Sequence, residues 1–316
     1  MNAEAHRSFA CFGGTVTVHV RGTSIASGEE AAGRAQERLL DAHRRLSRFL
    51  AESELSAFNR DPREKVPATP LMRALASAVA TVGAASGGLV DATLLEAIER
   101  AGYRRSLGDH RPVSLAEALS SRVERRPGQP HPSARWRAVG VDEGAGAIVR
   151  PPGVKIDSGG IAKGLLADLL AAELGEQRTF AIDCCGDIRI GGSGHQARRV
   201  LVDDPFGGAP IHELKLRDGA VATSGIGRRC WVGPDGKPSH HILDPSSGRP
   251  AFTGIVQATA LAPSALLAET YAKAALLSGP ERAPEWLPHG GIVVRDGGEV
   301  DVLAGDRPLA ESAVAA

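Results

Sequence analysis

An excess of charge of either sign is absent from this sequence. Its 316 residues include 37 Lys plus Arg and 37 Asp plus Glu, so the formal net charge is zero. Proteins that bind nucleic acid through bulk electrostatics need a clustered basic surface, which this balance does not supply. The composition therefore argues against nucleic acid as a partner. Hydrophobic residues make up 42% of the chain, enough for the core of a globular enzyme.

Cysteines are few and poorly spaced for cross-linking. The four of them form no C-x-x-C pair and two, Cys184 and Cys185, are adjacent. This spacing suits neither a disulfide framework nor a tetrahedral zinc site, and it favours a reducing compartment. The first 25 residues lack the apolar segment of a signal peptide, and no run reaches the about 18 apolar residues of a membrane span. We therefore expect a cytoplasmic protein with no membrane insertion.

Hydrophobic periodicity in the first half predicts mainly helices. Residues 7–25 alternate between apolar and polar side chains, which is typical of a half-buried strand. Leu and Ala recur at helical spacing over residues 29–50, and a second helix is expected over about 71–86. Residues 104–135 are rich in Arg, Pro and Ser, which predicts a surface loop with one short helix near 114–120.

The second half changes to short apolar runs separated by glycine turns. From Trp136 onward these runs predict strands, with helices at about 161–174 and 264–278 and a final strand pair in the last twenty residues. Strands and helices mix without a steady β-α-β repeat, so the sequence indicates an α+β fold.

A glycine-rich segment, GGSGHQA at 191–197, matches the spacing of a dinucleotide-binding fingerprint. That fingerprint must open a helix, whereas residues 198–202 have the pattern of another strand. A glycine-rich hairpin is the better interpretation.

The segment 157–164, DSGGIAKG, carries more information. It predicts a strand that ends at Asp157, a turn at Gly159 and Gly160, and a helix that begins at about residue 161. Glycines that allow close approach, free N–H groups at a helix start and an ammonium group together resemble a phosphate cradle. An ordinary strand-to-helix turn with a surface lysine explains the same residues equally well.

Three further groups could carry chemistry. His240 and His241 precede Asp244 and a Pro/Gly turn, and histidine is the side chain best suited to proton transfer near neutral pH, although exposed loop histidines are the simpler reading. Ser224 ends a predicted strand, as either a ligand contact or a turn former. Glu269 and Lys273 lie four residues apart on one helical face, where such a pair usually stabilises a solvated helix.

In order along the chain, these segments resemble the ApbE family, the FAD:protein FMN transferases. The matching segments are GT at 14–15, LSRF and SELSAFN within 46–59, SGGLVDAT at 86–93, DSGGIAKG at 157–164, CGDIR at 185–189, TSG at 223–225 and HILDP at 241–245. The likeness covers most of the chain, which implies one domain over residues 1–316 with a flexible tail from about 305.

The resemblance implies a two-lobed α+β fold with mixed, largely antiparallel sheets, flanking helices and a ligand cleft between the lobes. It also implies transfer of FMN from FAD, with Mg²⁺, to a Ser or Thr hydroxyl of a target flavoprotein, releasing AMP. His241 would assist proton transfer. The residues implied in flavin binding are Asp91, Asp157, Gly159, Gly160, Lys163, Ser224, His241 and Ile242.

Four positions depart from the family pattern. The family's metal ligands are an Asp, a Thr four residues later, and a backbone carbonyl that corresponds to Gly160. This chain has Glu269 and Lys273 at the first two positions, and an ammonium group cannot ligate Mg²⁺. Gly13 and Cys185 also replace a Met and a Gly of the family motifs. Either Lys273 supplies the positive charge in place of the ion, or the chain is a non-catalytic FAD-binding relative or an FAD pyrophosphatase.

Overall fold

A single antiparallel sheet forms the centre of the molecule. The computed structural model describes residues 4–105, 112–120 and 124–309. In spatial order the strands of the sheet are β1 (Ala5–Cys11), β2 (Gly14–Arg21), β6 (Thr179–Cys184), β7 (Asp187–Gly191), β10 (Gly219–Gly225), β15 (Ile255–Ala262), β16 (Gly291–Arg295) and β17 (Val300–Leu303). All neighbouring pairs in this sheet are antiparallel. The α+β class expected from the sequence is confirmed.

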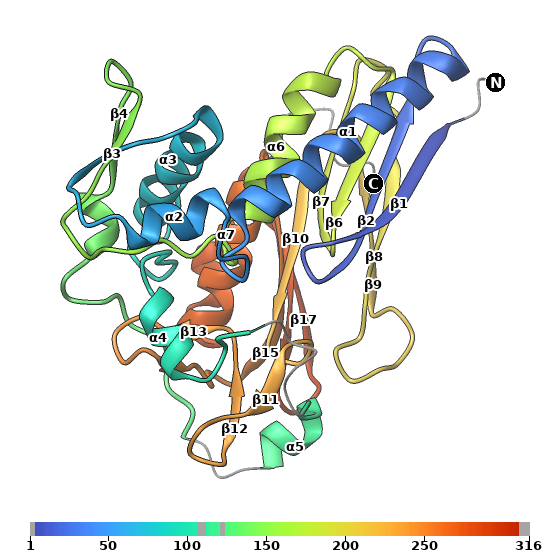
Figure 1. The fold of residues 1–316 in the computed structure, drawn as a ribbon. Coiled ribbons are helices and arrows are strands. Elements are labelled where there is room, and N and C mark those ends of the chain that lie inside the picture. Colours follow the sequence, from blue (N-terminus) through green and yellow to red (C-terminus); the bar gives the residue numbers. More distant parts are fainter. Residues whose placement is uncertain (1–3, 106–111, 121–123, 310–316) are drawn as a thin grey trace.

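Three long helices cover one face of this sheet (Figure 1). They are α1 (Ile25–Leu46), α6 (Ala162–Leu174) and α7 (Ala265–Ser278). Helices α6 and α7 cap each other. The Glu269 carboxylate of α7 accepts the Gly164 N–H of α6 at 2.9 Å, and the Asp168 carboxylate of α6 accepts the N–H groups of Ala265 and Leu266 in α7 at 2.7 and 2.9 Å. These bonds satisfy amides at both helix starts that would otherwise be unpaired. The start of each of these two helices is thus hydrogen-bonded to the other helix.

A two-stranded hairpin packs on the opposite face of the sheet. It consists of β8 (Arg198–Val202) and β9 (His212–Leu216), whose buried side chains contact Ile190 and Val221. The strand at 198–202 confirms that the glycine-rich segment does not open a helix. The expected hairpin is wrong, however: β7 pairs with β6 and β10, and β8 pairs only with β9. Residues 192–197 therefore cross from the sheet to a second layer.

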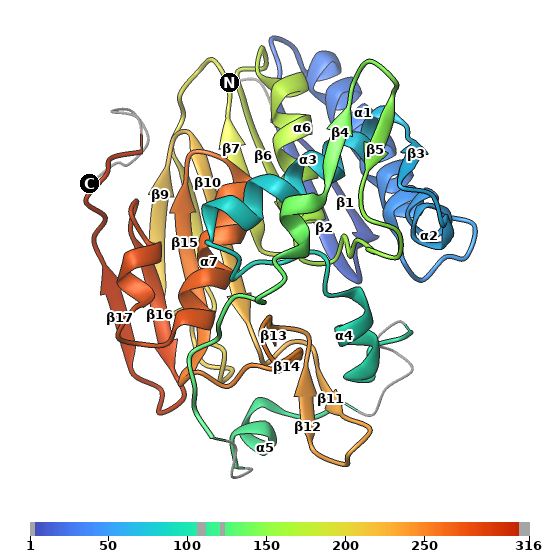
Figure 2. The same ribbon diagram turned by 90° about the vertical axis from the view of Figure 1, so that its left-hand side faces the viewer.

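The remaining elements form a second lobe beside the helical layer. Its upper part contains α2 (Glu54–Arg60), α3 (Pro70–Ala85) and a three-stranded sheet of β3 (Lys65–Pro67), β5 (Ala147–Val149) and β4 (Gly140–Asp142). Its lower part contains α4 (Leu95–Arg100), α5 (Leu115–Ser120) and two hairpins, β11 (Cys230–Val232) with β12 (Pro238–His240) and β13 (Leu243–Asp244) with β14 (Arg249–Pro250). The described residues also contain a 3₁₀ turn at Arg135–Ala138, against α3, and one at Ala283–Trp286, against α7. Figure 2 shows α4 and the two hairpins below the helical layer.

Two sequence predictions of strands need correction. The single strand expected over residues 7–25 is a hairpin of β1 and β2, which turns at Phe12 and Gly13, both with positive φ (53° and 73°). No strand ends at Asp157: residues 154–158 have no regular secondary structure, and the Asp157 N–H donates to the carbonyl of Ala92 at 2.8 Å. Of the tail expected from about residue 305, residues 310–316 lie outside the described part.

Candidate functional site

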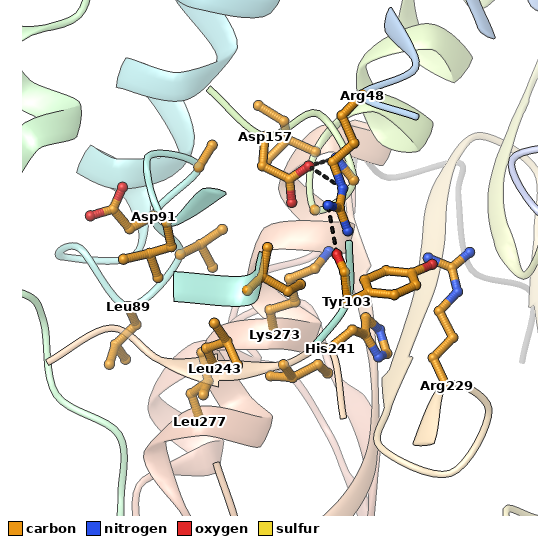
Figure 3. A pocket seen from close by; sticks show the side chains of 18 of the residues that line it. Arg48, Leu89, Asp91, Tyr103, Asp157, Arg229, His241, Leu243, Lys273 and Leu277 are labelled. Carbon is orange, nitrogen blue, oxygen red and sulfur yellow. Dashed lines mark hydrogen bonds and ion pairs between the residues drawn. The ribbon is translucent and has the colours of Figure 1, made fainter. Parts of the chain in front are cut away.

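One cavity lies where the helical layer meets the second lobe, and its volume is about 130 Å³. Most of its walls are apolar, formed by side chains such as Leu89, Ile161, Leu243 and Leu277. Figure 3 shows the charged groups that also line it. An apolar lining with a few convergent polar groups suits a partly aromatic ligand.

The structure brings most of the predicted site residues to this cavity. Those that line it are Asp91, Asp157, Gly159, Gly160, His241 and Ile242, together with Lys273. Lys163, Ser224 and Glu269 are not among the lining residues. Ser224 is buried in β10. Glu269 lies on α7, and its carboxylate accepts from Lys273 and from the Gly164 amide at the start of α6.

The side chain of Lys163 points towards the core, not into the cavity. Its ammonium group forms an ion pair with the carboxylate of Asp187, which is 1% exposed. Burial alone would lower the pKa of Lys163, but the charges of Asp187 and Glu269 raise it. The expected helix start is present one residue before Lys163, yet the ammonium faces a buried carboxylate and not the cavity.

Lys273 and Glu269 form a second buried ion pair. The Nζ atom of Lys273 lies 2.8 Å from Oε1 of Glu269, and the two side chains are 14% and 2% exposed. A Cβ atom added to Gly160 would lie 3.8 Å from Cε of Lys273. The lysine chain therefore runs between Gly160 and Glu269 at the cavity wall. Glu269 and Lys273 are therefore not the solvent-exposed ion pair that this spacing on a helix most often indicates.

The two adjacent histidines occupy different surroundings. His240 is fully buried against Phe252, and its Nδ1 accepts the N–H of Ile242 at 3.3 Å. Burial lowers the pKa of His240 to about 3. His241 lines the cavity, and its Nδ1 has no hydrogen-bond partner among the described residues. Burial, assisted by the nearby Arg229, His240 and Lys273, lowers the pKa of His241 well below its ordinary value. His241 is therefore neutral at pH 7 and able to accept a proton.

Two arginines at the cavity were not singled out from the sequence. Arg48 is 7% exposed; its Nε lies 3.4 Å from Oδ1 of Asp157, and its Nη1 donates to the Tyr103 carbonyl at 2.8 Å (Figure 3). Its guanidinium also contacts the rings of Phe49 and Tyr103. Arg229 lies on another wall and donates to the carbonyl of Phe12 at 3.0 Å. Arginine is so frequent in this chain that residue type alone gave no signal at either position.

Metal ligands do not gather at the cavity. No group of three or more His, Cys, Asp or Glu side chains within residues 4–105, 112–120 and 124–309 could hold a metal ion. In the same ranges, no helix is both long and apolar enough to cross a membrane.

Comparison with known proteins identifies the family. The model of the ApbE family matches residues 12–294, so the chain belongs to this family. It is 24% identical to the FAD:protein FMN transferase of Vibrio cholerae over 313 residues, covering 95% of this chain and 86% of that protein. It is 34% identical to the FAD:protein FMN transferase of Treponema pallidum over 162 residues, which span 46% of this chain and 44% of that relative.

Solved structures of the family share the fold. An ApbE protein from Thermotoga maritima superposes with a TM-score of 0.76 and 26% identity, covering 95% of this chain and 97% of that one. The flavinyl transferase ApbE of Pseudomonas stutzeri gives a TM-score of 0.72 at 22% identity over 96% and 95% of the two chains. The two-lobed ApbE fold is thereby confirmed.

Proposed function

We propose that this protein is an FAD:protein FMN transferase, which moves FMN from FAD to a Ser or Thr hydroxyl of a target flavoprotein and releases AMP. One observation carries the proposal. Asp91, Asp157 with Gly160, and His241 come from three separate segments of the chain, and all line one cavity. Family membership and the names of its relatives support the same reaction. A cytoplasmic location belongs to the same proposal.

The reaction transfers a phosphoryl-linked group. The acceptor oxygen bonds to the phosphorus of the FMN half, the bond from that phosphorus to the bridging oxygen breaks, and AMP leaves with the electron pair. The hydroxyl proton passes to neutral His241 and from there to the AMP phosphate. Arg48, Arg229 and Lys273 line the cavity, and fixed positive charges stabilise the negative charge that develops on such phosphates. The apolar walls would exclude water, which would otherwise compete with the acceptor hydroxyl.

The residues present do not fit a Mg²⁺ ion at the position that the family resemblance implies. Mg²⁺ requires near-octahedral oxygen ligands at about 2.1 Å. The Lys273 side chain occupies the space between Gly160 and Glu269, and one Glu269 oxygen accepts from the Gly164 amide. We therefore assign to Lys273 the positive charge that an ion would supply there, and no step of the reaction requires a metal.

A direct test uses the purified protein with FAD and a Thr-containing acceptor peptide, with EDTA or with Mg²⁺. The proposal predicts a covalent FMN mass shift on the acceptor and one AMP per label in both conditions. AMP release without labelling would identify an FAD pyrophosphatase. Thermal stabilisation by FAD with neither product would identify the non-catalytic FAD-binding alternative, which the buried Lys273–Glu269 pair also permits. No stabilisation at saturating FAD would contradict all three functions.

A further inference from the structure

A second cavity adjoins the first and has no role in the reaction described above. Its volume is about 190 Å³, and it shares Asp91 and Leu94 with the first cavity as a common wall. Its other walls come from α4, from the loop at 131–135 and from the turn at 245–248. A ligand that occupied both cavities would pass over this common wall.

The second cavity is preformed by hydrogen bonds between its walls. The Asp244 carboxylate accepts the N–H groups of Gln129 and Ser246 at 2.8 and 3.1 Å, and the Gln129 carbonyl accepts the Ser246 N–H at 2.9 Å. Gly248 lies so close to α4 that an added Cβ would meet the Cβ of Ala97 at 3.1 Å. The turn is therefore fixed both to the segment that leads to the 131–135 loop and to α4.

Its lining differs from that of the first cavity. Hydroxyl groups come from Thr93, Ser133, Ser246 and Ser247, whereas apolar side chains dominate the first cavity. Flat flavin or purine rings gain most from apolar walls, while an extended peptide needs partners for its backbone and polar side chains. This contrast favours a peptide in the second cavity.

Charge further defines the ligand. Arg100 and Arg135 line the second cavity, and neither forms an ion pair with any residue in the described ranges. Of the acids that line the second cavity, Glu96 pairs with Lys155 at 3.1 Å, and Asp91 lies at the wall shared with the first cavity, where it accepts the N–H and hydroxyl of Thr93 at 2.8 and 2.6 Å. Two arginines without partners attract a carboxylate.

We propose that the second cavity binds an acidic, extended segment of the acceptor protein, next to the Ser or Thr whose hydroxyl enters the first cavity. This inference rests on the proposed function, because covalent transfer requires a segment of the acceptor to reach FAD. Arg100 and Arg135 bind an Asp or Glu of that segment, and the hydroxyl groups of the cavity bind its backbone. The site selects acceptors by charge without contacting the reacting phosphorus.

The test compares charge-reversal variants of equal net charge. The test variant carries Arg100→Glu and Arg135→Glu; the control carries Arg104→Glu and Arg137→Glu, which change neighbouring exposed residues that do not line the cavity. Each FAD-loaded protein is used to select binders from a displayed library of random 12-residue peptides. Selected peptides are then synthesised, and their affinity is measured by fluorescence anisotropy at about 0.15 M salt.

The wild type and the control should select peptides with Asp or Glu near a Ser or Thr, and the test variant should bind these peptides at least about tenfold more weakly, because attraction becomes repulsion. Peptides without acidic enrichment, or equal affinity for the test variant, would overturn the proposal. Competition between FAD and the peptides would also overturn it, since the cavity would then belong to the nucleotide site. The affinity of the wild type for FAD is measured separately. A wild type that failed to bind FAD would contradict the proposed function, whereas loss of peptide selection alone would contradict the peptide site.

Discussion

The ammonium group of Lys163 and the carboxylate of Asp187 form an ion pair in the core, between the first turn of α6 and the start of β7. Burial raises the pKa of Asp187 and the charge of Lys163 lowers it, while Asp187 in turn raises the pKa of Lys163. The other oxygen of Asp187 is buried without a partner in the described part of the chain. The pair therefore fixes the start of α6, behind the cavity.

Replacing Lys163 should destabilise the fold more than it affects a ligand. Lys163→Met leaves the Asp187 charge buried and unpaired, which typically costs about 3–5 kcal/mol. Lys163→Met with Asp187→Leu removes both charges and should recover most of that loss. Urea unfolding would measure both effects. A stable Lys163→Met protein that bound FAD weakly would instead show that Lys163 contacts the ligand.

His241→Ala should reduce FMN transfer by about 10²- to 10⁴-fold, the usual contribution of general acid-base catalysis. FAD affinity should change little, because the proton is transferred only during the reaction. The pKa of His241 is lowered by burial and by nearby positive charges. The wild-type rate should therefore stay constant as pH falls to 6.5 and decline only at lower pH. Equal losses of rate and of FAD affinity would refute the assignment.

His240 should make the fold sensitive to acid. Its pKa is about 3 in the folded protein and about 6.5 in the unfolded chain, so between these values the unfolded chain binds more protons. Stability is therefore highest above pH 6.5 and falls as the pH decreases towards 3, by up to about 1.4 kcal/mol per pH unit. His240→Asn should flatten this slope, and His195→Asn, at an exposed position, should not. Denaturant unfolding between pH 4 and 7 would detect the difference.

Gly164 and Gly33 should respond oppositely to replacement by alanine. A Cβ on Gly164 would lie 2.6 Å from the carbonyl oxygen of Ala265, where α6 and α7 meet, whereas nothing lies within 4 Å of one on Gly33. Gly164→Ala should destabilise the fold by about 1–3 kcal/mol or more. Gly33→Ala should stabilise it by about 0.5–1 kcal/mol, because alanine favours a helix interior. Equal unfolding midpoints for the two variants would contradict this account of the α6–α7 contact.

The fold class and most helices could be predicted because they depend on local periodicity. The α6 and α7 helices lie within one or two residues of their expected bounds. The β1–β2 turn was missed because Phe12, a bulky residue, adopts a positive φ that usually marks glycine. The segment before Asp157 resembles a strand in sequence, but its backbone pairs with no neighbouring strand in the described part of the chain. Ile156 exchanges hydrogen bonds with the side chain of Asn59, and the Asp157 N–H donates to a loop carbonyl.

The site was predictable where chemistry is confined to a short motif. The residues of DSGGIAKG that line the cavity lie up to and within the turn before α6, and those of HILDP lie between β12 and β13 and at the start of β13. The orientation of the Lys163 side chain could not be predicted, since it depends on Asp187, which lies on β7. Arg48 and Arg229 were missed for the same reason: their importance comes from Asp157 and Phe12, which lie more than 100 residues away along the chain.

The Lys273–Glu269 pair gives the sharpest test of the proposed site. If the ammonium of Lys273 supplies the positive charge, EDTA should leave both FAD affinity and transfer unchanged in the wild type. Lys273→Ala should weaken FAD binding, and Lys273→Met should do the same while retaining most of the side-chain volume. Loss with both variants would separate the effect of charge from that of packing. Unfolding measurements would show whether Glu269, then left unpaired in the core, destabilises the protein.

Exchanging both residues should make the site dependent on a metal ion. Lys273→Thr with Glu269→Asp removes the ammonium and provides two oxygen ligands near Gly160, so added Mg²⁺ should raise FAD affinity or transfer in this variant alone. The sign follows from charge, because the ammonium of the wild type repels a divalent cation from the same place. Isothermal titration with FAD, with and without Mg²⁺, measures the change, and Lys273→Met is the control that removes the charge without adding a ligand. Strong Mg²⁺ dependence of the wild type would refute the role given to Lys273, because the ion would then bind despite its ammonium group.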